Sequence, residues 1–141
     1  MRKWCKYGIL GLFSLNVYAE EFNPNQPLNL NENEMAYFVS FSMPEPQLVS
    51  AIKSAEQLSI PVYLNGLVKN SMGATAKAML YLAQKYNVQG VQVDPTRFTY
   101  YGIQSVPALV KKCGSKFDVI YGNVEIKHLL ETIEREGECK K

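Results

Sequence analysis

Residues 90–110 read Gly-Val-Gln-Val-Asp-Pro-Thr-Arg-Phe-Thr-Tyr-Tyr-Gly-Ile-Gln-Ser-Val-Pro-Ala-Leu-Val, and they carry the strongest structural signal in the chain. The pattern predicts a short buried strand over 91–93, a break at Asp94, one or two helical turns that end at Gly102, and a second apolar strand. Pro107 stands at the start of that second strand. Because proline has no N–H to donate to a sheet, it is confined to strand starts, edges and bulges.

The order of these features resembles the second half of thioredoxin-fold proteins. Val-x-Val-Asp comes first, then Tyr-Gly-Ile, then Val-Pro and an apolar strand, and this succession is specific where a lone Val-Pro would not be. In that family the proline is cis, and its loop faces the redox Cys-x-x-Cys. The resemblance therefore implies a cis peptide bond before Pro107, in the one kind of bond for which the cis form costs little.

The rest of the chain fits an α/β protein of this type. Near-continuous apolar residues over 35–42 and 60–65 predict strands, the first of them covered on both faces. Further strands are predicted over 106–112 and 116–121, and helices up to about 58, over 72–86 and over 125–136. The helix over 72–86 is an insertion ahead of the proline strand, and we expect its apolar stripe to be core. The predicted fold is thioredoxin-like, with a central mixed sheet of four to five strands flanked by helices.

The N-terminal segment reads as a secretory signal peptide, with a basic start, an apolar run and a small-x-small pattern that ends at Ala19. We expect cleavage after Ala19, export to the periplasm and no stable membrane anchor. An uncleaved anchor is the alternative. Cys5 precedes the apolar run and does not fit a lipid-attachment site. Residues 20–34 are rich in Asn, Pro and Glu and are expected to form an extended arm, and 35–141 a single domain.

Charge argues against nucleic-acid binding. The formal net charge is +2, and the predicted signal peptide carries three basic residues and no acidic one, which leaves −1 on the mature chain. A nearly neutral domain lacks the basic surface that binds phosphates. No motif for a cofactor or small-molecule substrate is present, and His128, the only histidine, predicts no metal site. Asp94 is expected to cap a helix and Arg97 to form a surface ion pair.

Redox chemistry is missing where the thioredoxin plan would place it. The catalytic Cys-x-x-Cys of that family lies at the start of the first long helix, and residues 42–46 here read Ser-Met-Pro-Glu-Pro. No cysteine occurs between Cys5 and Cys113, whereas a thiol enzyme needs a reactive thiolate at such a helix start. We therefore predict no enzymatic activity. The Ser-x-x-Glu pattern of 42–45 instead predicts a helix capping box.

Cys113 and Cys139 are predicted to form a structural disulfide. Cys113 lies at the tip of the predicted hairpin. From this tip the last strand runs ~17 Å away at its ordinary rise per residue, and the last helix returns over ~20 Å. Cys139 should therefore arrive beside Cys113, and an exported compartment would oxidise the pair. A redox-active pair and two free thiols are the alternatives.

A closer resemblance covers residues 35–136. It rests on Ser-Phe-Ser-Met-Pro-Glu at 40–45, Ile-Pro-Val-Tyr-Leu-Asn-Gly-Leu at 60–67, Gly-Val-Gln-Val-Asp-Pro at 90–95, Val-Pro-Ala-Leu at 106–109 and Tyr-Gly-Asn-Val at 121–124. Together these blocks resemble the TrbC family, the periplasmic pilus-assembly proteins of F-type conjugative type IV secretion systems. The resemblance implies a non-catalytic assembly factor that binds TraW-like periplasmic components, with pilin as a further candidate partner.

We expect such partners to bind beside the cis-proline loop, where thioredoxin folds hold extended polypeptide through backbone hydrogen bonds. The predicted binding surface combines the loop over 65–70 with Ser42, Met43, Pro44, Glu45, Pro46, Ser105, Val106 and Pro107. For 42–46 the alternative is a capped helix start without a ligand. Two other functions stay open, namely a thiol-disulfide isomerase that uses Cys113 and Cys139 and a holdase chaperone for pilin.

Overall fold

The computed structural model describes residue 27 and residues 29–139, so the predicted signal peptide, its cleavage after Ala19 and most of the predicted arm lie outside it. The elements follow the predicted order of strands and helices. They are β1 (Met35–Val39), α1 (Glu45–Gln57), β2 (Val62–Leu64), the 3-10 turn η2 (Val68–Asn70), α2 (Met72–Tyr86), β3 (Val91–Val93), α3 (Pro95–Tyr100), β4 (Ala108–Cys113), β5 (Lys116–Tyr121) and α4 (Ile126–Glu136).

The five strands form one mixed sheet in the order β3-β2-β1-β4-β5. β1 pairs parallel to β2, and β2 pairs parallel to β3. β4 runs antiparallel to both β1 and β5, with Ala108 opposite Phe38. The predicted mixed sheet flanked by helices is thus confirmed. Since β1 is central, four of its five residues are buried, as its apolar sequence indicates.

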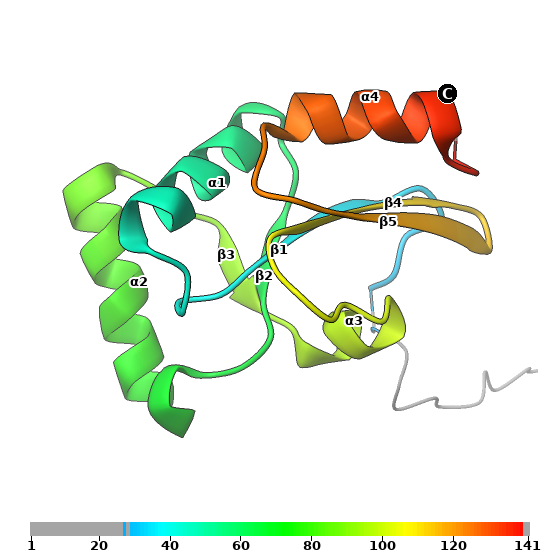
Figure 1. Cartoon of the computed structure of the whole chain (residues 1–141). Helices are drawn as coiled ribbons and strands as arrows, with labels where there is room; N and C mark the ends of the chain where they lie inside the picture. Colours follow the sequence, from blue (N-terminus) through cyan, green and yellow to red (C-terminus); the bar gives the residue numbers. More distant parts are fainter. Residues whose placement is uncertain (1–26, 28, 140–141) are drawn as a thin grey trace, which may run out of the picture.

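Helices cover the two faces of the sheet unequally (Figure 1). α1 and α4 pack on one face, where Ile52, Leu129 and Ile133 join Leu109 of the sheet in one apolar cluster. Within the described residues, the short α3 is the helix on the other face, where it packs on a smaller aromatic cluster. There the ring of Phe98 meets that of Phe38 edge-on, with 4.7 Å between the centroids.

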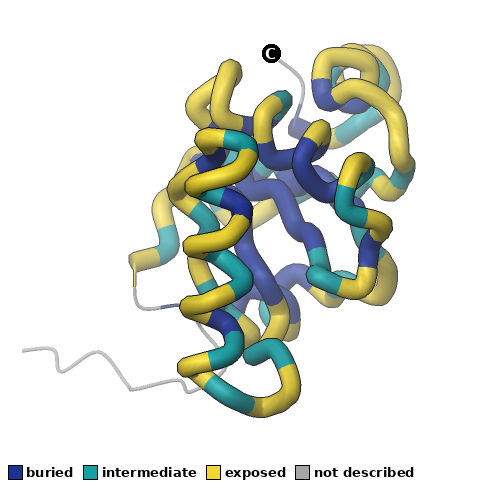
Figure 2. Tube along the Cα trace, turned by 90° about the vertical axis from the view of Figure 1, so that its left-hand side faces the viewer, coloured by how far each residue is buried: buried dark blue, intermediate teal, exposed yellow. Residues whose placement is uncertain are grey.

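The apolar stripe of α2 is not core, so the expectation for this helix was wrong. Only Thr75 and Leu82 of α2 are buried, and Figure 2 shows the helix mostly exposed. Met72 is 65% exposed and Leu80 56%. The reason is geometric: α2 lies beside the edge strand β3, whose three residues offer little surface for a helix of 15 residues to cover.

Arg97 is buried, and the expectation of a surface ion pair was wrong. Its side chain is 2% exposed, and its guanidinium lies 2.8 Å from Glu34 and 2.7 Å from Asp94. Asn29 accepts two further hydrogen bonds from it, each 3.0 Å long. Burial alone would lower the pKa of Arg97, but its hydrogen bonds to Glu34 and Asp94 raise it on balance. Asp94 also accepts from the backbone N–H of Arg97 and so caps α3, as predicted.

The buried guanidinium fixes the segment before β1. Glu34 is 8% exposed and, besides Arg97, accepts a hydrogen bond from the hydroxyl of Tyr101. The backbone of this segment also pairs with the hairpin, because Lys112 N–H donates to Glu34 O at 2.8 Å and Gly114 N–H to Glu32 O at 2.9 Å. Residues 29–34, which belong to the predicted arm, therefore pack on the domain where the structure describes them.

Replacing Arg97 should destabilise the domain strongly. Arg97→Met leaves Glu34 buried without its cation, which typically costs about 3–5 kcal/mol of unfolding free energy. Arg135→Met is the matched control, because the Arg135–Glu136 pair is exposed and such pairs contribute about 0–1 kcal/mol. Urea unfolding of both variants measures the difference. Equal losses in the two variants would contradict the assigned role of Arg97.

The burial of Tyr37 predicts a loss of stability at high pH. Its side chain is 2% exposed, and this burial raises its pKa from 10.0 to about 12. Between these values the unfolded chain loses the phenolic proton while the folded chain keeps it, so the unfolding free energy falls as pH rises; below pH 10 the contribution is constant. Urea unfolding at a series of pH values should show a smaller fall for Tyr37→Phe than for wild type. An identical pH profile would refute this.

Candidate functional site

The sheet brings the predicted binding segments to one end, where β1 and β2 finish and β4 begins. We call this end of the sheet the binding edge. β1 and β2 are parallel, so their C-terminal ends, Val39 and Leu64, lie opposite each other. β4 is antiparallel to β1, and its first residue, Ala108, pairs with Phe38. The residues that follow β1 and β2 and those that precede β4 therefore meet at the same end of the sheet.

The turn after β1 is held by short-range hydrogen bonds. The backbone N–H of Ser42 donates to the hydroxyl of Ser40 at 3.0 Å, and the two hydroxyls lie 2.8 Å apart. The N–H of Met43 donates to the carbonyl of Ser40 at 3.1 Å. Ser42 is exposed and Met43 is buried. Met43 therefore anchors the turn in the core while the serine faces outward.

The predicted capping box is absent. α1 begins at Glu45 with Pro44 as its N-cap residue, and no side chain caps it. Ser42 instead bonds to Ser40, two residues before it. The sequence pattern failed because Pro44 and Pro46 have no backbone N–H. The first turn of α1 therefore has fewer free N–H groups that the hydroxyl of Ser42 could accept hydrogen bonds from.

Glu45 instead ties α1 to α2. Its carboxylate accepts hydrogen bonds from the hydroxyls of Tyr81, at 3.2 Å, and Tyr86. The ammonium of Lys85 lies 3.6 Å from the same carboxylate. The hydrogen bond from Tyr86 is the main reason why the pKa of Glu45 is lowered. The inserted helix thus braces the start of α1, which sequence periodicity did not reveal.

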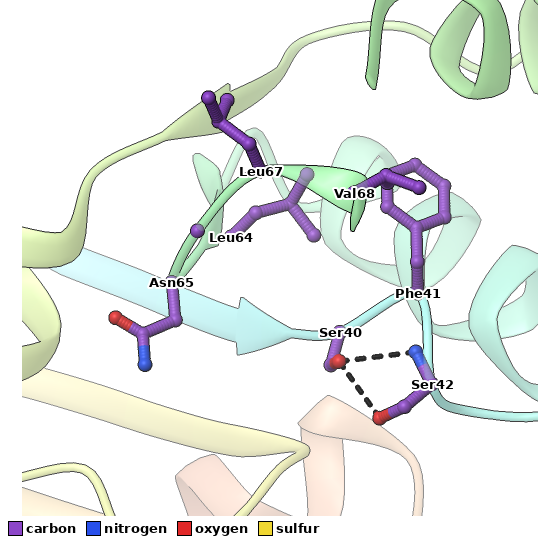
Figure 3. Close-up of a pocket in the computed structure, with 8 residues that line it drawn as sticks. Ser40, Phe41, Ser42, Leu64, Asn65, Leu67 and Val68 are labelled. Atoms are coloured by element: carbon purple, nitrogen blue, oxygen red, sulfur yellow. Dashed lines mark hydrogen bonds between the residues drawn. The ribbon is translucent and has the colours of Figure 1, made fainter. Parts of the chain in front are cut away.

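A pocket opens between the turn after β1 and the loop after β2 (Figure 3). It has a volume of about 380 Å³. Its lining residues are Ser40, Phe41, Ser42, Leu64, Asn65, Gly66, Leu67 and Val68. Ser42 and residues 65–68 of the predicted 65–70 loop therefore share one cavity. Lys69 and Asn70 do not line it.

The proline loop lies at the same end of the sheet. The Val106–Pro107 peptide bond is cis in the structure. Ser105 is exposed, Val106 half-buried and Pro107 buried. The carbonyl of Pro107 accepts from the N–H of Gly122 at 3.2 Å, which joins the loop to the turn that follows β5. Ser105–Pro107 do not line the pocket of Figure 3, and Pro46 borders a different groove.

The predicted disulfide is confirmed, and it lies away from this edge. Cys113, at the far end of β4, is bonded to Cys139 with 5.5 Å between their Cα atoms. The backbone N–H of Cys139 donates to the Asp118 carboxylate at 2.7 Å. Cys139 is 1% exposed. The bond therefore links the C-terminal segment to the β4–β5 hairpin.

Signals for a metal site or a membrane span are absent from the described ranges. Among residues 27 and 29–139, no three His, Cys, Asp or Glu side chains are grouped so that they could hold a metal ion. The imidazole of His128 lies on the surface, 3.6 Å from Glu131. Within the same ranges, no helix has the length and apolar character needed to cross a membrane.

Comparison with known proteins identifies the family. A family model described as the type-F conjugative transfer system pilin assembly protein, TrbC, matches residues 37–133. The chain belongs to this family. A similar protein is the periplasmic protein TrbC of Escherichia coli (strain K12). It is 42% identical over 104 residues, which are 74% of this chain and 49% of that protein. The chain thus spans about half the length of this curated TrbC relative. No solved structure matches it.

Loss of the disulfide should lower stability without removing the fold. The bond closes a loop with a sequence separation of 26 residues, and closing a loop of this size stabilises by roughly 3 kcal/mol. We expect the unfolding free energy of the double variant Cys113→Ala/Cys139→Ala to be lower by that amount, so that it unfolds at a lower urea concentration. Adding reductant should have the same effect on wild type and none on the variant. Wild type unfolding at the same urea concentration with and without reductant would show that the bond does not stabilise the fold.

Proposed function

We propose that the chain is a non-catalytic assembly factor that works by binding protein partners at the sheet edge described above. Membership in the family supports a role in type-F conjugative pilin assembly. The observation that carries the proposal is the juxtaposition of Ser42, the 65–68 loop and the cis-proline loop at one end of the sheet. Loops at this end of the sheet carry small polar side chains that can hydrogen-bond the backbone of an extended polypeptide segment. TraW-like components and pilin are the partners we propose.

Export to the periplasm, with cleavage after Ala19, and a thioredoxin-like fold complete this proposal. A relative named as a periplasmic protein supports the compartment. Topology supports the fold, because β1-α1-β2 and the later antiparallel hairpin bracket a cis-proline at the edge. In this scheme the site has lost its thiols: residues 42–46 hold no cysteine.

A thiol-disulfide isomerase is the weaker alternative. Attack on a disulfide needs access to one of its sulfur atoms. Cys139 is 1% exposed and Cys113 only half-buried, so Cys113 is the accessible side. This alternative requires chemistry at the hairpin end, opposite the cis-proline loop. A readily reduced bridge and insulin-reductase activity would support it over the binding function.

A holdase chaperone for pilin is favoured by one observation, the exposed apolar residues of α2. Met72, Leu80 and Tyr81 are 65%, 56% and 44% exposed. Apolar surface of this kind binds unfolded chains without defined stoichiometry. Suppression of aggregation that depends on these side chains, and not on the cis-proline loop, would favour the chaperone.

The binding edge can be tested with two exposed serines at opposite ends of β4. Ser105→Arg places a bulky cation beside the cis-proline loop, and Ser115→Arg places it in the hairpin turn beside the disulfide. We expect the first variant to weaken partner binding at least tenfold, because an arginine buried in the interface without a partner charge costs more than the roughly 1.4 kcal/mol that corresponds to a tenfold change in Kd. Pilus production and mating efficiency should therefore fall when this variant replaces the wild-type gene. The second variant should behave as wild type.

Periplasmic abundance of both variants, measured by immunoblot, controls for folding. Normal pilus production by a well-folded Ser105→Arg variant would refute binding at this edge. Loss of function confined to Ser115→Arg would move the functional surface to the hairpin end and favour the isomerase.

A further inference from the structure

A second groove lies between α1 and the turn that leads from β5 into α4. It has a volume of about 520 Å³ and opens on the helix-covered face of the sheet. Ser50 and Ser54 line it from α1, and Asn123, Val124 and Glu125 line it from the turn. Tyr37 of β1 reaches it from below the helices.

The hydroxyl of Tyr37 is the unusual feature of this groove. The side chain is 2% exposed, yet no hydrogen bond to its hydroxyl is found among the residues that the structure describes. Burial alone accounts for its raised pKa, with no hydrogen-bonding partner contributing. A buried hydroxyl without a partner is unfavourable, and such groups in native proteins call for an explanation. An acceptor supplied by a ligand in the groove would explain this one.

The other polar groups of the groove are open to solvent or a ligand, because Ser50 and Asn123 are exposed and Ser54 is half-buried. Within the described ranges, the side chains of Ser50, Ser54 and Asn123 make no hydrogen bond to the protein. Hydroxyl and amide groups both donate and accept. They can therefore pair with alternating N–H and C=O groups of a peptide backbone. Ala51, Ser50 and Ser54 are small side chains on this face of α1, so a peptide backbone has room to approach the helix.

The groove is continuous with the proposed binding edge. Pro46 belongs to the predicted binding surface and also lines this groove. The turn on its other side is attached to the proline loop, because Gly122 N–H donates to the carbonyl of Pro107 at 3.2 Å. A segment held at the edge can thus continue between α1 and the turn that precedes α4 without leaving the surface.

We propose that this groove binds an extended, neutral or basic segment of the partner polypeptide, and that a backbone carbonyl of the segment accepts the hydrogen bond of Tyr37. The inference rests on the proposed function and extends its binding surface. Val124, which is 53% exposed, and Pro46 provide apolar contact for a side chain of the segment. Glu125 is the one formal charge of the lining, which disfavours acidic segments and phosphates.

Peptide binding to the exported full chain tests this assignment. The probes are overlapping short peptides that cover the pilin and the other periplasmic proteins of the same transfer system, with affinity measured by fluorescence anisotropy. Ser50→Trp fills the groove from an exposed position and should weaken the best peptide at least tenfold. Glu134→Trp, at an exposed position near the other end of α4, is the control and should leave affinity unchanged.

Tyr37→Phe separates a binding role from a structural one. If the hydroxyl has no partner in the free protein, this variant should have unchanged or higher thermal stability near neutral pH, because it removes an unpaired buried polar group. It should weaken peptide binding about fivefold, the loss of one hydrogen bond. Lower stability with unchanged affinity would show that the hydroxyl is satisfied within the fold, and it would overturn the proposal.

Two further outcomes separate this proposal from the proposed function. Peptide binding that is lost in Ser105→Arg and kept in Ser50→Trp leaves the edge as the binding site and refutes the groove. Failure of every peptide to bind wild type refutes both the groove and edge binding of extended segments.

Discussion

One buried cation organises the fold. Arginine has five N–H donors, and all of those of Arg97 are used, by Glu34, Asp94 and Asn29. Its guanidinium carbon also lies 4.8 Å from the centroid of the Tyr63 ring. These partners come from the segment before β1, from β2 and from the end of β3. A desolvated charge is tolerated only when it is paired and fully hydrogen-bonded. The position of α3 and the entry of the chain into β1 are therefore set together, and the aromatic face of the sheet packs around them.

The two ends of the sheet are held by different interactions. At one end the disulfide joins Cys139 to the hairpin, and backbone bonds from Gly114 and Lys112 hold the segment before β1. At the other end the chain leaves β1 and β2 through open turns and enters β4 through a cis-proline. The disulfide and the hydrogen bonds that hold the segment before β1 thus lie at the end where no binding is proposed. The end with the cis-proline loop presents exposed polar groups on strands that the disulfide and the hydrogen bonds hold at their opposite end. Such preorganisation lowers the entropy lost when a partner binds.

Local sequence patterns were sufficient for the order of strands and helices along the chain and for the disulfide. Residues 90–110 indicated a strand, a turn and a proline-led strand because glycine, proline and alternating valines act within a few residues. Matching the lengths of a strand and a helix was enough to bring Cys113 and Cys139 together. Arg97 could not be placed in this way, because its main partner, Glu34, lies 63 residues away. Likewise nothing local to Tyr37 reveals that it is buried under α1 while its hydroxyl has no hydrogen-bonding partner among the described residues.

The start of α1 shows why a local pattern can mislead at a functional edge. Ser-x-x-Glu normally caps a helix, yet Glu45 is taken by Tyr81 and Tyr86 of α2, and two prolines remove the donors that a cap would satisfy. α2 contributes little to the core, because two of its residues are buried. Its hydrogen bonds to Glu45 therefore explain its position better than the burial of its apolar residues does. By hydrogen-bonding Glu45, the first residue of α1, the inserted helix also holds the end of the turn over 40–44. This contact holds the start of α1, where the described residues provide neither a side-chain cap nor a disulfide.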